Sequence, residues 1–260
     1  MTEEALLLKE RRGEEFRLTL NRPRAFNSLS GELLTELERA IDELAVDASV
    51  RVVVLTGNGK AFCAGHDLKE IGADRSYGPV HALFTHCSRV MMKLTRMPQP
   101  VIARVDGIAT AAGCQLVAAC DLAICSDISR FATSGVKFGL FCSTPMVALS
   151  RNVGRKLAME MLLTGDFIDA QRALAEGLVN EVVAPGELDD AVGRMVARLT
   201  DKPASVLALG KRAFYAQLEL GMEAAYAMTT DVIVDNALGK EFEEGLEAFT
   251  GKRKPVWNAA

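Results

Sequence analysis

The sequence predicts an α/β fold in which a largely parallel sheet carries helices on both faces. Strand-like segments alternate with helical segments over the first two hundred residues, which is the element order of α/β proteins. Three segments are almost continuously apolar, as strands covered on both faces must be: RVVVLTG (51–57), PVIARVDG (100–107) and LAICS (122–126). After Thr200 the strand pattern stops, and only helical segments follow.

The N-terminal part begins with two predicted strands, ALLLKE and FRLTLN, joined by the polar turn RRGEE. Ser30 is typical of a helix N-cap. Apolar residues at helical spacing follow it: Leu33, Leu34, Leu37, Ile41 and Leu44. Beyond this first helix, the pattern predicts helices over 79–95, 113–119, 144–150, 155–163 and 187–199.

The C-terminal part is expected to hold three helices, over 203–217, 221–237 and 239–249. We therefore divide the chain into a core, residues 1–199, and a helical region, residues 200–260. Three short helices bury few large side chains by themselves, so this region is expected to pack on the core or on a neighbouring subunit, which indicates an oligomer. The side chains concerned are Phe214, Tyr215, Tyr226, Met228, Phe242 and Phe249.

The composition excludes several classes of protein. The 260 residues carry a net charge of −4, which argues against a basic nucleic-acid surface. Six cysteines lack any C-x-x-C pair, so neither a zinc site nor another metal site is expected. No window approaches 18 apolar residues, so no membrane span is expected. The acidic start MTEEALLLKERRGEEF does not look like a signal or transit peptide, which predicts a cytoplasmic protein with reduced cysteines.

Two junctions between a strand and a helix are candidates for chemistry. LTGNGKAFCAGHDLKE (55–70) and VDGIATAAGCQLVAACD (105–121) are both rich in glycine and alanine. The first amides of a helix lack an intrahelical acceptor, and small side chains let a ligand approach them. One N–H from each junction would form an oxyanion hole for a thioester oxygen that becomes negative during reaction. Alternatively, the small residues only permit close packing of helices.

Several segments resemble the enoyl-CoA hydratase/isomerase (crotonase) superfamily, in order and over about residues 5 to 257. They are NRPRAFNSLS, AFCAGHDLKE, DGIATAAGCQLVAACDLAICSD, FATSGVKFGL, LAMEMLLTGDFIDAQRALAEGLVNEVV and AFTGKRKPVW. The resemblance implies a spiral of ββα repeats followed by a C-terminal helical region that builds a trimer or a dimer of trimers. It also implies an acyl-CoA substrate, with coenzyme A as part of the substrate and no separate cofactor.

The resemblance assigns the two amides of the oxyanion hole. In the family's AGxD motif the donor is the residue between Gly and Asp, here His66. The second donor is the second small residue of a GGG run, matched here by AAG, hence Ala112. Alanine keeps the N–H but adds a methyl group. Ala112 must therefore adopt a φ that a residue with a Cβ tolerates, and the methyl group narrows the floor of the site.

The two glutamates of family hydratases are replaced. Their positions hold Gln115 and Gly135. Neither residue carries a proton near neutral pH, and each positioned acid or base is worth roughly 10² to 10⁴ in rate. We therefore expect a poor hydratase. An acyl-CoA decarboxylase or isomerase and a non-catalytic acyl-CoA-binding protein are the alternatives.

The same resemblance predicts a coenzyme A site from the NRPxAxN loop, the AGxDLK segment and the C-terminal AFTGKRK. The residues are Arg24, Ala25, Phe26, Ala64, Asp67, Lys69, Phe249 and Lys252, of which the last two often come from a neighbouring subunit. Cationic side chains suit phosphates. Alternatively, Arg24 and Lys69 are solvated charges, and Asp67 caps a loop.

The sequence leaves the roles of several other side chains undecided. The His66 imidazole either faces the acyl group or is a polar wall, whereas His81 and His86 are five positions apart and do not share a face. Cys142 lacks a neighbouring activating group, and Thr144 before Pro145 is a candidate N-cap. An acyl pocket, or simply the core, holds Tyr77, Phe84, Phe131, Phe138, Phe141 and Met146. The segments HDLKE, ATAAGCQLVA, GLFCSTP and KRKPVW are similar to the hydratase-domain-containing branch, which is also found in mitochondria.

Overall fold

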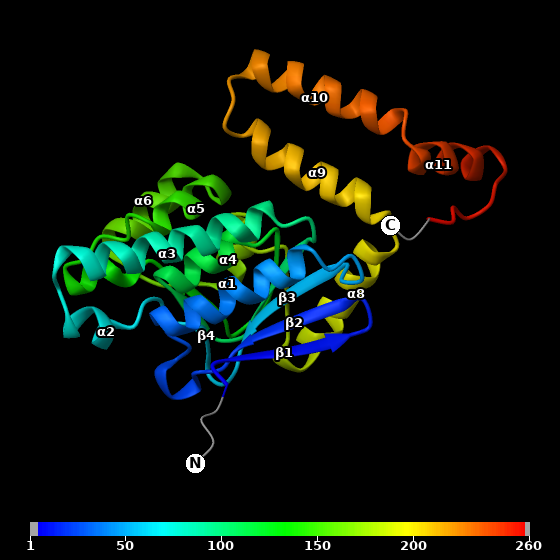
Figure 1. Ribbon diagram of the computed structural model, residues 1–260. Helices are drawn as coiled ribbons and strands as arrows, with labels where there is room; N and C mark the ends of the chain where they lie inside the picture. Colours follow the sequence, from blue (N-terminus) through cyan, green and yellow to red (C-terminus); the bar gives the residue numbers. More distant parts are fainter. Residues whose placement is uncertain (1–4, 258–260) are drawn as a thin grey trace.

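The computed structural model describes residues 5–257. A six-stranded sheet forms its centre (Figure 1). In spatial order its strands are β1 (Leu7–Arg12), β2 (Glu15–Leu20), β3 (Val52–Gly57), β5 (Val101–Val105), β7 (Leu122–Ser126) and β10 (Glu181–Val183). The pair β1 and β2 is antiparallel, and every other pair is parallel. The expectation of a largely parallel α/β sheet is confirmed.

A second, smaller sheet was not predicted from the sequence. Its strands are β4 (Ala61–Cys63), β6 (Ile108–Thr110), β8 (Arg130–Ala132) and β9 (Ile168–Asp169). Each has two or three residues, which is too short to show an alternating pattern. A long strand, a short strand and a helix follow one another in β3–β4–α2 and again in β5–β6–α4, as in a ββα repeat.

Except for two short helices that were not predicted, at 68–73 and 170–175, the helices lie close to their predicted positions. They are α1 (Gly31–Ala45), α2 (Leu68–Ala73), α3 (Tyr77–Arg96), α4 (Ala112–Ala119), α5 (Pro145–Asn152), α6 (Arg155–Thr164), α7 (Ala170–Ala175), α8 (Leu188–Thr200), α9 (Ala204–Gln217), α10 (Met222–Ala237) and α11 (Lys240–Thr250). Short 3₁₀ helices cover Pro23–Ala25, Ser134–Phe138 and Pro185–Glu187. The Ser30 hydroxyl accepts the Leu33 N–H at 3.2 Å, so Ser30 caps α1 as expected.

Both faces of the large sheet are covered, which explains its continuously apolar strands. Val53 and Leu55 of β3 point into the main core with α1 and α3, whereas Val52 and Val54 pack with Leu188 and its neighbours on α8. Because successive side chains of a strand point to opposite faces, two helical layers require an apolar residue at every position.

The C-terminal helices extend away from the core as a hairpin of α9 and α10 followed by α11 (Figure 1). A buried ammonium group ties α9 to the core. Lys211 Nζ donates to the carbonyl oxygens of Leu94 and Gln99, each at 2.8 Å, and lies 2.6 Å from the Asp121 carboxylate. Tyr215 donates to the same carboxylate at 2.9 Å. Asp121 also accepts the Val101 N–H at 2.7 Å, so this carboxylate joins α9 to the start of β5.

Apart from this anchor, the large side chains of α9 to α11 remain uncovered within one chain. Exposed residues include Phe214, Met222, Tyr226, Ile233, Leu238, Phe242 and Phe249. So many exposed apolar side chains are typical of a surface that another chain covers. The residue ranges of the core and the helical region, and assembly into a trimer, stay predictions.

Candidate active site

At the first junction, the N–H of His66 points away from the neighbouring segment around Leu29. Leu29 forms an isolated parallel bridge with His66: Leu29 N donates to Gly65 O at 2.7 Å, and Asp67 N donates to Leu29 O at 3.1 Å. In this pattern the N–H of His66 itself points to the opposite side. Among the described residues no backbone acceptor faces it.

The second junction presents the amide of Ala112, the first residue of α4. Ala111 N donates to Ala132 O at 3.0 Å, whereas the Ala112 N–H has no backbone acceptor within residues 5–257, as expected for the first turn of a helix. The unusual backbone falls on Ala111, with φ 51° and ψ −120°, a conformation that favours glycine. The compatible φ expected at Ala112 is required at Ala111 instead, and that expectation is corrected.

The two junctions are in contact. A Cβ added to Gly65 would lie 2.8 Å from the Ala111 Cβ and 3.2 Å from the Ala112 nitrogen. A Cβ at Gly113 would overlap the Cys63 carbonyl oxygen and lie 2.7 Å from the carbonyl carbon. Both glycines are therefore required for close packing, and that packing also places the two free amides beside each other.

The His66 side chain borders the same place. Its ring centroid lies 4.6 Å from that of Phe84, and its Nε2 is buried without a hydrogen-bond partner. Burial lowers the pKa of His66 from 6.5 to about 4, because an apolar surrounding disfavours the charged ring. At neutral pH the imidazole is uncharged, so it can give or accept a hydrogen bond but is a weak base.

We expect this histidine to make the stability of the protein depend on pH. Between pH 6.5 and about pH 4 the unfolded chain binds a proton at His66 that the folded protein excludes. The free energy of unfolding should therefore be flat with respect to this group above pH 6.5 and fall by up to about 3 kcal/mol on acidification through the window. Urea unfolding at a series of pH values measures this slope.

The matched variants are His66→Gln, which should lose the slope, and His81→Gln, which should keep it because His81 is exposed. An unchanged slope in His66→Gln would show that another group excludes the proton.

Gln115 lies on α4 one turn after Ala112 and is 4% exposed. Its Oε1 is buried without a partner, which is costly for a polar atom unless a ligand or water meets it. An amide exchanges no proton near neutral pH. One helical turn after the Ala112 amide, α4 thus carries a buried polar side chain that does not ionise.

Gly135 lies in the 3₁₀ helix Ser134–Phe138, and the chain folds back over it. Leu140 N donates to Gly135 O at 3.0 Å. A Cβ on Gly135 would overlap the Leu140 carbonyl oxygen and lie 2.8 Å from Cys142 Sγ. The space that a side chain would need at this position is filled by the segment from Leu140 to Cys142.

The remaining candidates for proton transfer are separated from one another. His81 lies beside Tyr77, with ring centroids 5.3 Å apart, whereas His86 faces α1, with Nε2 2.9 Å from the Glu38 carboxylate. The expectation that they do not share a face is confirmed. Cys142 is buried, and burial raises the pKa of its thiol, which favours the inert interpretation.

Six of the eight predicted coenzyme A residues lie near one another around the first junction. Ala64 N donates to Phe26 O at 3.0 Å, which joins the loop of Arg24, Ala25 and Phe26 to the segment of Ala64, Asp67 and Lys69. Phe26 is exposed, as are Arg24 and Lys69. Asp67 accepts the Lys69 N–H at 3.1 Å and caps α2.

Arg22 was not singled out in the sequence, although it lies in the same motif. It donates to the Asp67 carboxylate at 2.8 Å and to Ser28 O at 2.6 Å. Burial of Asp67 opposes its ionisation, but the Arg22 contact and the backbone N–H groups of Lys69 and Glu70 together outweigh burial and lower the pKa of this carboxyl. Arg22 and Asp67 therefore fix the two segments against each other.

Phe249 and Lys252 belong to the end of α11 and the turn after it, away from α2 and β4 (Figure 1). Phe249 is 82% exposed. Within one chain these two residues do not join the other six.

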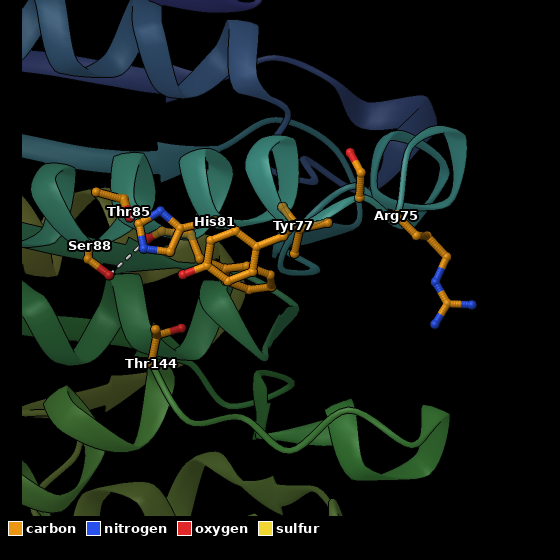
Figure 2. A pocket seen from close by; sticks show the side chains of 9 residues that line it. Arg75, Tyr77, His81, Thr85, Ser88 and Thr144 are labelled. Carbon is orange, nitrogen blue, oxygen red and sulfur yellow. Dashed lines mark hydrogen bonds between the residues drawn. The ribbon is translucent and has the colours of Figure 1, made fainter.

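A groove of about 640 Å³ runs between α3 and the start of α5 (Figure 2). It is lined by Arg75, Ser76, Tyr77, Val80, His81, Phe84, Thr85, Ser88 and Thr144. Two of the candidate acyl-pocket residues, Tyr77 and Phe84, line this groove. Phe131 is a fully buried core residue, and Phe138, Phe141 and Met146 are exposed outside this lining.

Other classes of site receive no support. Within residues 5–257, no cluster of three or more His, Cys, Asp or Glu side chains is arranged to hold a metal ion. No described helix is long and apolar enough to cross a membrane. All six cysteines are free thiols.

Comparisons with known proteins concern the family and the fold of the chain. The family model described as enoyl-CoA hydratase/isomerase matches residues 15–260. The mitochondrial enoyl-CoA hydratase domain-containing protein 3 of Xenopus laevis is 46% identical over 241 residues, which are 93% of this chain and 82% of that protein.

Two solved structures share the fold. An enoyl-CoA hydratase of Mycobacterium smegmatis is 54% identical, with a TM-score of 0.96 over 98% of this chain and 99% of that chain. The human enoyl-CoA hydratase domain-containing protein 3 is 43% identical, with a TM-score of 0.94 over 97% and 100%. The expected crotonase-like α/β fold and the hydratase-domain-containing branch are thereby confirmed.

One expectation is overturned. The chain was expected to be cytoplasmic, but the relatives named enoyl-CoA hydratase domain-containing protein 3 are mitochondrial in Xenopus laevis, rat, mouse and human. On the family itself the motifs, the fold and the comparisons agree: the chain belongs to the enoyl-CoA hydratase/isomerase family.

Proposed function

We propose that this protein binds an acyl-CoA thioester and polarises its carbonyl between the amides of His66 and Ala112. The carrying observation is that both N–H groups lack a backbone acceptor in the described chain and lie where Gly65 meets Ala111 and Ala112. Preorganised donors of this kind stabilise the negative oxygen of an enolate, and one donor is worth roughly 10² to 10³ in rate.

We further propose that hydration of an enoyl thioester is slow. That reaction needs a proton removed from water and another delivered to the α-carbon. The positions that the resemblance assigns to the two glutamates hold an amide, Gln115, and a glycine without room for a side chain, Gly135. His66, with its pKa of about 4, is a weak base at neutral pH.

Decarboxylation or isomerisation of an acyl-CoA is the second candidate. Loss of CO₂ generates the enolate directly, so two amide donors suffice where no strong base is present. The uncharged Gln115 and the neutral His66 favour decarboxylation over hydration, whereas isomerisation would still need a group to move a proton between carbons. The third candidate, binding of acyl-CoA without turnover, needs the same amides.

Coenzyme A, as part of the substrate, is proposed to lie along Arg24, Ala25, Phe26, Ala64 and Lys69, with no separate cofactor. Phe249 and Lys252 would then come from a neighbouring copy, since one chain keeps them apart from this loop. The uncovered apolar side chains of α9 to α11 support an assembly, proposed as a trimer or a dimer of trimers.

The test is to incubate the protein with crotonyl-CoA and follow the conjugated thioester absorbance. We expect a hydration rate at least about 100-fold below that of a hydratase with both carboxylates, since each acid or base is worth 10² or more. Binding of butyryl-CoA, measured by calorimetry, should nevertheless be retained. Fast hydration would refute the argument from positions 115 and 135, and absence of thioester binding would refute the proposed function.

A further inference from the structure

We propose that the groove between α3 and α5 selects acyl groups with an uncharged oxygen substituent, such as a hydroxyl, on the chain beyond the β-carbon. The inference rests on the proposed function, because it takes the thioester carbonyl to lie at the amides of His66 and Ala112.

A polar stripe on α3 carries the argument. Tyr77, His81, Thr85 and Ser88 are spaced by four, four and three residues, so they lie along one face of the helix. All four line the groove, with Thr144 on the opposite wall (Figure 2). Apolar groups share this lining, among them Val80 and Phe84. A groove made only for an alkyl chain has no need of such a stripe.

Most of these polar groups are not committed to bonds within the protein. Thr144 occupies the N-cap position of α5, but its side chain makes no capping bond. Among the described residues, no hydrogen-bond partner of the Tyr77 hydroxyl is found either. Thr85 Oγ1 is 3.5 Å from His81 Nδ1, at the limit for a hydrogen bond. Ser88 donates to Phe84 O at 2.9 Å and can still accept.

The charges of the groove favour a neutral substituent. Among the described residues, Arg75 is the only Lys or Arg in the lining, and its guanidinium points away from the other groove side chains (Figure 2). Within residues 5–257, no Asp or Glu lines the groove. A carboxylate would therefore lose water without gaining an ion pair, which is unfavourable, whereas a hydroxyl can both donate to and accept from the stripe.

The groove adjoins the proposed carbonyl position. The His66 ring contacts Phe84, and Phe84 is itself part of the lining. Ser88 lies one turn after Phe84 and its hydroxyl donates to Phe84 O at 2.9 Å, so the polar stripe comes within roughly 6 Å, one helical turn, of the residue that contacts His66. The inference takes an acyl chain of six carbons, held at the amides, to extend along this stripe.

The experiment compares three thioesters of equal chain length by calorimetry on the full chain: hexanoyl-CoA, 6-hydroxyhexanoyl-CoA and adipyl-CoA. One neutral hydrogen bond is typically worth a factor of about three to ten in affinity. We expect 6-hydroxyhexanoyl-CoA to bind tighter than hexanoyl-CoA by that factor, and adipyl-CoA to bind weakest.

Variants locate the effect. Thr85→Val and Thr144→Val remove a hydroxyl with little change of shape and should shrink the advantage of 6-hydroxyhexanoyl-CoA. Thr95→Val is the matched control, because Thr95 lies on the same helix outside the groove and its hydroxyl donates to Met92 O at 2.9 Å. Thermal unfolding establishes that each variant is folded.

Equal affinity for the hexanoyl and hydroxyhexanoyl thioesters would overturn the inference while leaving the proposed function intact. So would tightest binding of adipyl-CoA, which would indicate a cation in the groove, or an equal loss in Thr95→Val. If none of the three thioesters binds, the proposed function fails as well.

Discussion

The variant Gly113→Ala is expected to lower the free energy of unfolding by about 3 kcal/mol, the upper end for overpacking, and to abolish acyl-CoA binding. The added Cβ would overlap the Cys63 carbonyl oxygen and lie 2.9 Å from the Cys63 Cβ. Cys63 is fully buried in β4, so neither backbone can yield without moving the start of α4. Because the Ala112 amide is the first of that helix, the same movement displaces a proposed donor.

Urea unfolding and calorimetry with butyryl-CoA measure the two effects. Gly78→Ala is the control, since Gly78 lies in the first turn of α3 and a Cβ there meets no atom within 4 Å. This control should be neutral or slightly stabilising, because alanine is the better helix former. Near-normal stability with lost binding would still support the role of the Ala112 amide. Normal binding in Gly113→Ala would contradict it.

The sequence predicted the large sheet and most helices, because these elements carry long, regular patterns. The apolar run of β3 and the cap at Ser30 are examples, and both were found as expected. The small sheet was missed because β4, β6 and β8 have only three residues each. Their pairing depends on where the long strands place them, which no local pattern records.

The parts of the candidate site that depend on local backbone motifs were predictable from the sequence. Small residues indicated the two junctions, the family resemblance assigned His66 and Ala112 within them, and the structure brings these junctions into contact. The closed space at Gly135 was not predictable, because it depends on how the segment through Leu140 folds back. The polar stripe of α3 was visible in principle as Tyr77, His81 and Thr85 at helical spacing, but only the structure shows that it lines a groove.

Placing glutamates at positions 115 and 135 tests why hydration is slow: because the carboxylates are missing, or because the site has no room for them. Gln115→Glu is expected to raise crotonyl-CoA hydration by about 10²-fold, the lower end for one acid or base. The site at position 115 is buried, and burial raises the pKa of a carboxyl toward neutrality, where proton transfer is efficient. Gln115 already occupies the required volume, so stability should change little at low pH, where the buried carboxyl is protonated, and should fall as the pH rises and the carboxyl ionises.

Gly135→Glu is expected to bring no gain and to cost at least about 2 kcal/mol of unfolding free energy, because its Cβ would overlap Leu140 O and press on Cys142 Sγ. A variant that combines Gln115→Glu and Gly135→Glu should then hydrate crotonyl-CoA no faster than Gln115→Glu alone. Gly193→Glu reports the cost of a glutamate at an open helical glycine, where a Cβ meets nothing within 4 Å. If Gly135→Glu is as stable as Gly193→Glu and accelerates hydration, the segment over position 135 moves aside readily. In that case the missing carboxylates alone, and not the lack of room at position 135, would explain slow hydration.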